Sequence, residues 1–148
     1  MSPIDPEQLY GSWLLERFVI RFADGRDPVY PFGEDASGLL VYAPDGYMSA
    51  VLSRAGRPSL AASRLETARR APAEQRAAAF DGYLSYGGRW RIEGREVVQE
   101  VTHALTPNLV GAANRRRVAL SEGRVVLSYD LPARSGVTRH YSLTWRRP

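Results

Sequence analysis

Short hydrophobic stretches, many of them alternating with polar residues, run along most of the chain. Gly, Pro, Asp and Asn separate these stretches, which is typical of strands joined by turns. The pattern predicts eight strands, at residues 12–22, 37–43, 47–53, 84–92, 97–105, 113–120, 125–130 and 137–146. Neither an internal repeat nor a domain boundary interrupts it, so we expect a single domain over residues 1–148.

The segment between the third and fourth predicted strands differs from the rest. Residues 72–82 are rich in Ala, Glu, Gln and Arg, and Pro72 suits a first helical turn, so we predict one helix there. Residues 54–71 are rich in Arg, Ser and Gly. We expect them to form a surface loop, which is a candidate lid.

Turn residues predict which side chains share a face of the sheet. Pro-Asp-Gly at 44–46 predicts a tight hairpin that pairs Ala43 with Tyr47. Counting by twos from this turn and from the turns at 93–96 and 121–124 gives the inward positions. They are Leu40, Tyr42, Met48, Ala50, Leu52, Tyr86, Trp90, Ile92, Val97, Gln99, Val101, His103, Asn114, Arg116, Val118, Leu120, Val125, Leu127 and Tyr129.

This count places the three arginines at 115–117 on different faces of the strand. Only Arg116 points inward, whereas Arg115 and Arg117 face solvent, where an arginine needs no special explanation. In the last strand, Arg139 falls on the same side as Tyr141.

The first strand fits two alternative patterns. One pattern places Arg17 inward with Trp13, Leu15 and Val19, and the other favours Leu14, Phe18 and Ile20. A β-bulge would switch the strand from one pattern to the other.

Eight strands joined mostly by short turns predict an all-β fold, an eight-stranded antiparallel up-and-down β-barrel with one helix between the third and fourth strands. Such a barrel is either filled by side chains or holds one small ligand. Three arginines on the predicted inner face would be costly in a dry core, so we expect a cavity.

Several motifs resemble known lipocalin-like proteins. "YGSW" at 10–13 resembles the Gly-x-Trp signature of lipocalins, in which the tryptophan closes one end of the barrel. The stretches "YPFGEDASGLLVYAPDGYMSAVL", "AAAFDGYLSYGGRW" and "TPNLVGAANRRRVAL", with the terminal "LTWRR", resemble the bacterial and fungal lipocalin-like domain family. The chain departs from that family's pattern at Gln99, where a histidine is frequent, and at Thr102, where an acid is frequent.

This resemblance implies a barrel with a small-molecule pocket. Some members of the family are associated with polyketide biosynthesis, and similar barrels include cyclases that fold a polyene or polyketide chain. The implied partner is a hydrophobic or partly anionic small molecule.

Composition narrows the chemistry. All 20 basic residues are arginine and no cysteine is present, which excludes a lysine Schiff base, a thiolate nucleophile and a disulfide. The net charge of +4 is a weak argument for nucleic-acid binding, and we expect no nucleic-acid partner. We also expect no membrane partner and a cytoplasmic location, because no apolar stretch approaches a membrane span. The sequence does not distinguish between a monomer and a homodimer as the oligomeric state.

Cofactor sites are not predicted. The two histidines, His103 and His140, fall on opposite faces, which argues against a metal site. The glycine pair in "YGGRW" indicates a bulge or tight curvature rather than a phosphate loop. The sequence also has no nucleophile elbow. We therefore expect no metal and no cofactor.

Three residues are candidates for catalysis. Arg116 could clamp a carboxylate or enolate, or could instead pack over Trp13 as a structural arginine, a role for which Arg139 and Arg146 also compete. His103 could be a general acid or base, or a strand-end histidine bound to its neighbours. Tyr86 could polarise a carbonyl, or could be an amphipathic wall residue.

The candidate ligand-binding residues are those that line the predicted interior. They are Arg17, Tyr42, Met48, Trp90, Gln99, Asn114, Tyr129 and Tyr141. Two functions follow. The first is a cofactor-free cyclase or isomerase that acts on a hydrophobic, oxygenated, polyketide-like intermediate by orientation and hydrogen bonding. The alternative is a non-catalytic binding or carrier protein for a similar molecule.

Overall fold

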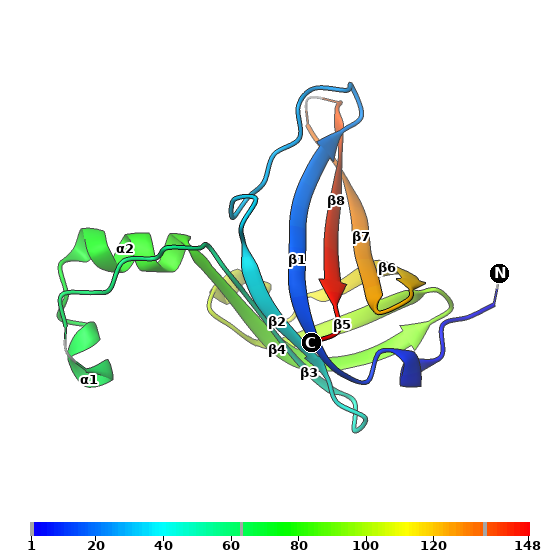
Figure 1. The fold of residues 1–148 in the computed structure, drawn as a ribbon, viewed down its shortest axis with the longest axis horizontal. Coiled ribbons are helices and arrows are strands. Elements are labelled where there is room, and N and C mark those ends of the chain that lie inside the picture. The colour runs from blue at the N-terminus through cyan, green and yellow to red at the C-terminus, as the bar shows by residue number, and fades with distance from the viewer. Residues whose placement is uncertain (1, 63, 135) are drawn as a thin grey trace.

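The computed structural model describes residues 2–62, 64–134 and 136–148 and shows eight antiparallel strands that close into a barrel in chain order (Figure 1). The strands are β1 (Gly11–Phe22), β2 (Ser37–Tyr42), β3 (Tyr47–Ser53), β4 (Tyr83–Glu93), β5 (Glu96–Ala104), β6 (Ala113–Ser121), β7 (Arg124–Pro132) and β8 (Thr138–Arg146). The 3-10 helices η1 (Pro6–Gln8) and η2 (Pro107–Leu109) precede β1 and β6. The predicted fold class is confirmed.

Two α-helices lie between β3 and β4. α2 (Ala73–Asp81) falls within the predicted helix, whereas the short α1 (Leu65–Ala68) lies in a stretch that was expected to be loop. Neither helix among the described residues is long and apolar enough to cross a membrane.

The hairpin turns have the predicted register. The Ala43 N–H donates to the Tyr47 carbonyl over 2.9 Å, and Gly46 has a φ of +91°, which favours glycine. Ile92 pairs with Val97 across the β4–β5 turn, as predicted. Because side chains alternate along a strand, these turns place the large apolar residues of the hairpins in one interior cluster.

One end of the barrel is closed around Trp13. Its ring is 2% exposed, and its indole N–H donates to the Leu9 carbonyl just after η1 over 3.0 Å. Arg147 lies over this ring, with 3.7 Å between its guanidinium carbon and the ring centroid. The structural arginine of the closed end is therefore Arg147, and Arg116 does not have this role.

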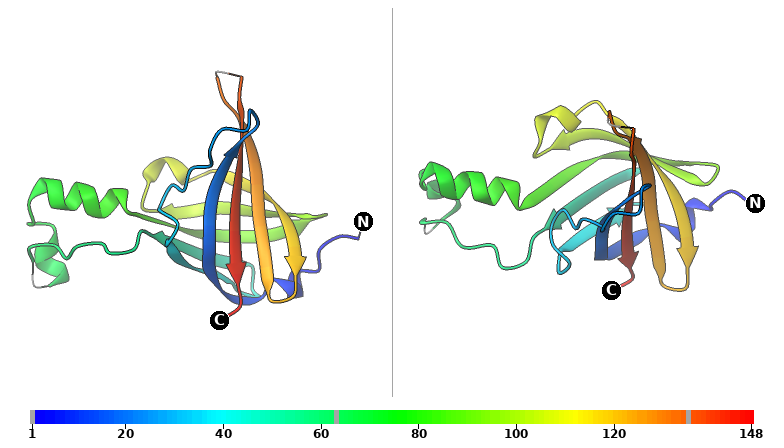
Figure 2. Two further views of the ribbon diagram at one scale, coloured as in Figure 1. Left: turned by 45° about the horizontal axis from the view of Figure 1, so that its top comes forward. Right: turned by 90° about the horizontal axis from the view of Figure 1, so that it is seen from above.

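The strands separate toward the other end, which we call the open end. β1 pairs with β2 only from Gly11 to Leu14 and then follows β8, and β6 pairs with β7 only from Arg117 onward. β1, β7 and β8 consequently run across the direction of β2 to β5 (Figures 1 and 2). The loop after β1 partly covers this end, since Val29 pairs with Ile20.

Two bulges shift the faces that were counted from sequence. In β1, Leu15 pairs with Trp145 and Arg17 with Thr144, so Glu16 is an extra residue and Phe18 turns inward. The expected inward placement of Arg17 is wrong, because its side chain is exposed on the outer face.

The second bulge lies in β5. Gly88 pairs with Val101 and Gly87 with His103, so Thr102 is the extra residue. A Cβ on Gly88 would lie 1.9 Å from the Glu100 carbonyl oxygen, which explains why glycine stands at this position. His103 is exposed on the outer face, and its expected inward placement is wrong.

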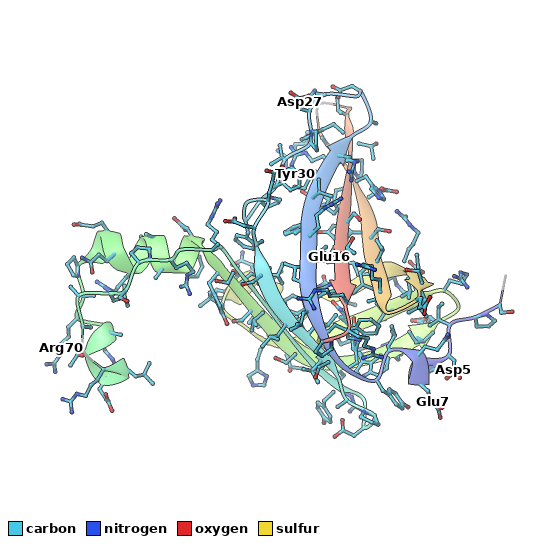
Figure 3. All side chains as sticks on the ribbon, viewed as in Figure 1. Asp5, Glu7, Glu16, Asp27, Tyr30 and Arg70 are labelled. Atoms are coloured by element: carbon cyan, nitrogen blue, oxygen red, sulfur yellow. The ribbon has the colours of Figure 1, made fainter. Side chains whose placement is uncertain are left out.

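We call residues 54–82 the arm. It leaves the open end and projects away from the barrel, and its α1 and α2 bury no residue (Figure 2). It carries six arginines and three acidic residues, a net charge of +3. Figure 3 places Arg70 on the part of the arm far from the barrel. Nothing in this arrangement shows the arm closing over the barrel, so a lid remains a prediction, and Ser63 within it lies outside the described residues.

Candidate functional site

Six polar or amphipathic side chains from six strands face the barrel interior. We call them the polar belt: Tyr42 of β2, Tyr86 of β4, Gln99 of β5, Arg116 of β6, Tyr129 of β7 and Tyr141 of β8. All six were predicted to be candidate site residues. Arg116, Tyr86, Tyr129 and Tyr141 are only partly buried, so the belt has access to solvent.

Gln99 links two of the tyrosines. The Gln99 Nε2 donates to the Tyr42 hydroxyl oxygen over 2.7 Å, and the Tyr86 hydroxyl donates to Gln99 Oε1 over 3.2 Å. Gln99 is 1% exposed and Tyr42 is fully buried. A buried polar network of this kind is stable only when its members are paired, so Gln99 holds both rings in place.

Arg116 is the charged member of the belt. Its β6 position pairs with Val97, which is fully buried, and the neighbouring inward position Asn114 pairs with Gln99. Arg116 and Gln99 are therefore diagonal neighbours on one face. No Asp or Glu within the described ranges forms an ion pair with Arg116, and its hydrogen bond runs from Nη1 to the Arg115 carbonyl over 3.0 Å.

An aromatic stack lies next to Arg116. Its guanidinium carbon is 3.7 Å from the centroid of the Tyr129 ring, and the Tyr129 and Tyr141 rings stack at 4.6 Å with 11° between their planes. Phe18, turned inward by the bulge in β1, lies 6.4 Å from Tyr141 and 6.2 Å from Phe32 of the loop before β2. The belt thus borders an aromatic surface toward the open end.

Burial controls the protonation of the belt tyrosines. It raises the pKa of Tyr42, Tyr86 and Tyr129 above the ordinary value, and the nearby Arg116 guanidinium opposes the increase at all three. All three hydroxyls therefore keep their protons at neutral pH, so the belt offers hydrogen-bond donors rather than a base.

Trp90 and Met48, predicted to bind ligand, are part of the packed core. The Trp90 indole N–H donates to the Ala43 carbonyl over 2.9 Å, and its ring lies 4.6 Å from Tyr42. Met48 is 6% exposed within the same cluster. Asn114 is partly buried on the interior face. Trp90 and Met48 therefore support Tyr42, and Asn114 lies beside the belt.

His103 and Arg17 do not join the belt. The His103 Nδ1 lies 2.9 Å from the Thr102 hydroxyl on the outer face, as in the alternative of a strand-end histidine bound to its neighbour. Arg17 follows the bulge at Glu16 and is exposed. Neither side chain is placed to meet a ligand inside the barrel.

Neither a metal cluster nor the hollow in the arm involves the polar belt. The described residues contain no cluster of three His, Asp or Glu side chains that could hold a metal ion. A hollow of about 440 Å³ lies in the arm between residues 54–60 and α2, and it includes no member of the polar belt. Phe18 was placed inward by the second of the two alternative patterns for the first strand, whereas Phe32, which lies in a loop, was missed.

Comparison with known proteins agrees with this architecture. The family model described as a lipocalin-like domain matches residues 10–148, which include all eight strands. No curated protein and no solved structure matches the chain significantly. A barrel of this kind is suited to binding small molecules. The chain belongs to the lipocalin-like domain family.

Proposed function

We propose that the chain binds a hydrophobic, oxygenated small molecule inside its barrel and promotes its cyclisation or isomerisation without a cofactor. The observation that carries this proposal is the position of Arg116, a charge that faces the interior beside the belt tyrosines and has no carboxylate partner in the described chain. Such an arrangement is costly for stability, and costly polar groups concentrate at functional sites.

The belt supports catalysis by donation and orientation. The Arg116 guanidinium and the protonated tyrosine hydroxyls would stabilise negative charge that develops on a carbonyl oxygen. The aromatic surface formed by Phe18, Tyr129 and Tyr141 would hold the apolar part of a polyketide-like chain in one folded conformation. Orientation alone can lower a barrier by several kcal/mol, roughly 7 or more in favourable cases.

A second candidate is a carrier that binds the same kind of molecule without changing it. It is favoured by one observation, namely that the polar belt contains no carboxylate or histidine to take a proton. An isomerisation that begins by proton abstraction would require such a base, whereas ring closure assisted by donors would not.

Turnover separates the two functions. Purified protein is incubated with a linear polyketide-like substrate bearing a carbonyl and a conjugated chain, and products of unchanged mass are separated by chromatography. The catalytic function predicts a cyclised or isomerised product that forms faster with the native protein than with Arg116→Ala, and Arg117→Ala serves as the matched outer-face control. Recovery of unchanged ligand from a stable complex would rule out catalysis for that substrate class and favour the carrier.

A further inference from the structure

We infer that the ligand carries an oxyanion, either a carboxylate or an enolate-type oxygen, held by Arg116. The inference rests on the proposed function, since it assigns the chemical class of the molecule that enters the barrel. Arg116 is one of the predicted catalytic residues, and the surroundings that leave its donors available follow from the structure.

Arg116 has unused donors. A guanidinium has five N–H groups, and one hydrogen bond, to the Arg115 carbonyl, is found within the described chain. Stacking on Tyr129 at 3.7 Å uses the face of the guanidinium and leaves its edge, where the N–H groups point, available. Two parallel donors at an edge match the two oxygens of a carboxylate.

Gln99 joins Tyr42 and Tyr86 into one hydrogen-bonded group. Gln99 Oε1 accepts from Tyr86, so the Tyr86 proton is used, and Gln99 Nε2 donates to the Tyr42 oxygen. Tyr42 and Gln99 are at most 1% exposed, so they form a packed layer that a ligand does not contact. Arg116 is only partly buried and is therefore the charged donor of the belt that a ligand can reach.

Arg116 lies beside this hydrogen-bonded group. Tyr42 is bonded to Gln99, and Gln99 is the diagonal neighbour of Arg116 on the same face. The guanidinium is also close enough to influence the Tyr42 hydroxyl electrostatically. A cation in a partly dry site favours an anionic oxygen over a neutral hydroxyl.

The test compares two probes of equal size. 2-Naphthoate carries a carboxylate, and 2-naphthalenemethanol carries a hydroxyl on the same ring system. Their affinities at pH 7.5 are measured by quenching of tryptophan fluorescence and checked by calorimetry. We expect the native protein to bind 2-naphthoate about tenfold or more tightly than the alcohol, as for a charge-assisted hydrogen bond.

Matched variants assign this preference to residues. Arg116→Gln should bring the affinity ratio close to one, and Arg116→Lys should keep part of it because the charge remains. Arg117→Gln loses the same charge from the outer face and should leave the ratio unchanged, which controls for net charge.

The other possible results would overturn the inference, its assignment to Arg116 or the proposed function. Equal affinities for the two probes in the native protein would overturn the inference and leave a neutral ligand for the proposed function. An equal loss in Arg116→Gln and Arg117→Gln would overturn the assignment to Arg116. Binding of neither probe would overturn the proposed function, and with it this inference. Circular dichroism and thermal melting of each variant distinguish a lost site from a lost fold.

Discussion

Arg147 lies flat against Trp13 and connects three parts of the closed end. Its guanidinium carbon is 3.7 Å from the ring centroid, and its Nη1 and Nη2 donate to the carbonyls of Ser12 and Gln8 over 3.1 and 3.2 Å. The C-terminal end of the chain is thereby attached to both β1 and the residues of η1.

Removal of this contact should destabilise the closed end. Arg147→Ala loses a cation–π contact and two hydrogen bonds to carbonyls, so we expect the free energy of unfolding to fall by about 1–2 kcal/mol. Arg146→Ala, an exposed arginine one residue earlier, should change it by less than about 0.5 kcal/mol. Urea denaturation of both variants measures the difference, and equal effects would contradict the role given to Arg147.

Gly88 should not tolerate a side chain. In Gly88→Ala the new Cβ would overlap the Glu100 carbonyl oxygen, so the bulge in β5 must rearrange, and we expect a loss on the order of 3 kcal/mol. Gly82→Ala is the control, because its nearest contact would be an ordinary 3.5 Å. Thermal melting decides, and a Gly88→Ala protein as stable as the control would show that the backbone is not constrained there.

The arm should be dispensable for folding. Replacing residues 55–81 by Gly-Asn-Gly keeps the hydrogen bond from the Arg54 N–H to the Gly82 carbonyl, and α1 and α2 bury no residue. We expect the free energy of unfolding to change by less than about 1 kcal/mol. A loss above about 2 kcal/mol in urea denaturation would mean that the arm packs against the barrel in solution.

Alkaline pH should weaken the fold through the belt tyrosines. Their pKa values are raised in the folded protein by burial, so their contribution to stability is complete below the ordinary value of 10.0 and decreases as pH rises above it. We expect the free energy of unfolding to decrease between pH 10 and 11.5, and Tyr42→Phe to reduce that slope by up to about 1.4 kcal/mol per pH unit. Absorbance at 295 nm reports tyrosine ionisation, and identical slopes would contradict the prediction.

Sequence alone predicted those parts of the fold that depend on local rules. The 44–46 turn and the alternation that follows from it correctly placed Leu40, Tyr42 and Met48 inside, because a two-residue period persists as long as the strand pairing is regular. The same count correctly separated Arg116 from its two neighbours.

The count failed wherever a bulge intervened. One extra residue at Glu16 and another at Thr102 reversed the faces that follow, which moved Arg17 and His103 outside. The glycine pair at 87–88 was a usable signal for the second bulge, whereas β1 showed only two competing patterns. The role of Arg147 depends on a contact between the two ends of the chain, which no local pattern predicts.

β6 and β7 pair over a short length only, and this affects how copies of the chain associate. Pairing with β7 begins at Arg117, so within the described chain the preceding part of β6 presents a strand edge on that side. Exposed strand edges recruit strands from other molecules, and charged side chains are a common protection. Arg115 is the exposed arginine of this part, because Arg116 faces the interior over Tyr129 and Arg117 is already paired with Ser128 of β7. The unpaired edge is therefore short and carries a charged side chain, which makes it a poor template for a strand from another molecule.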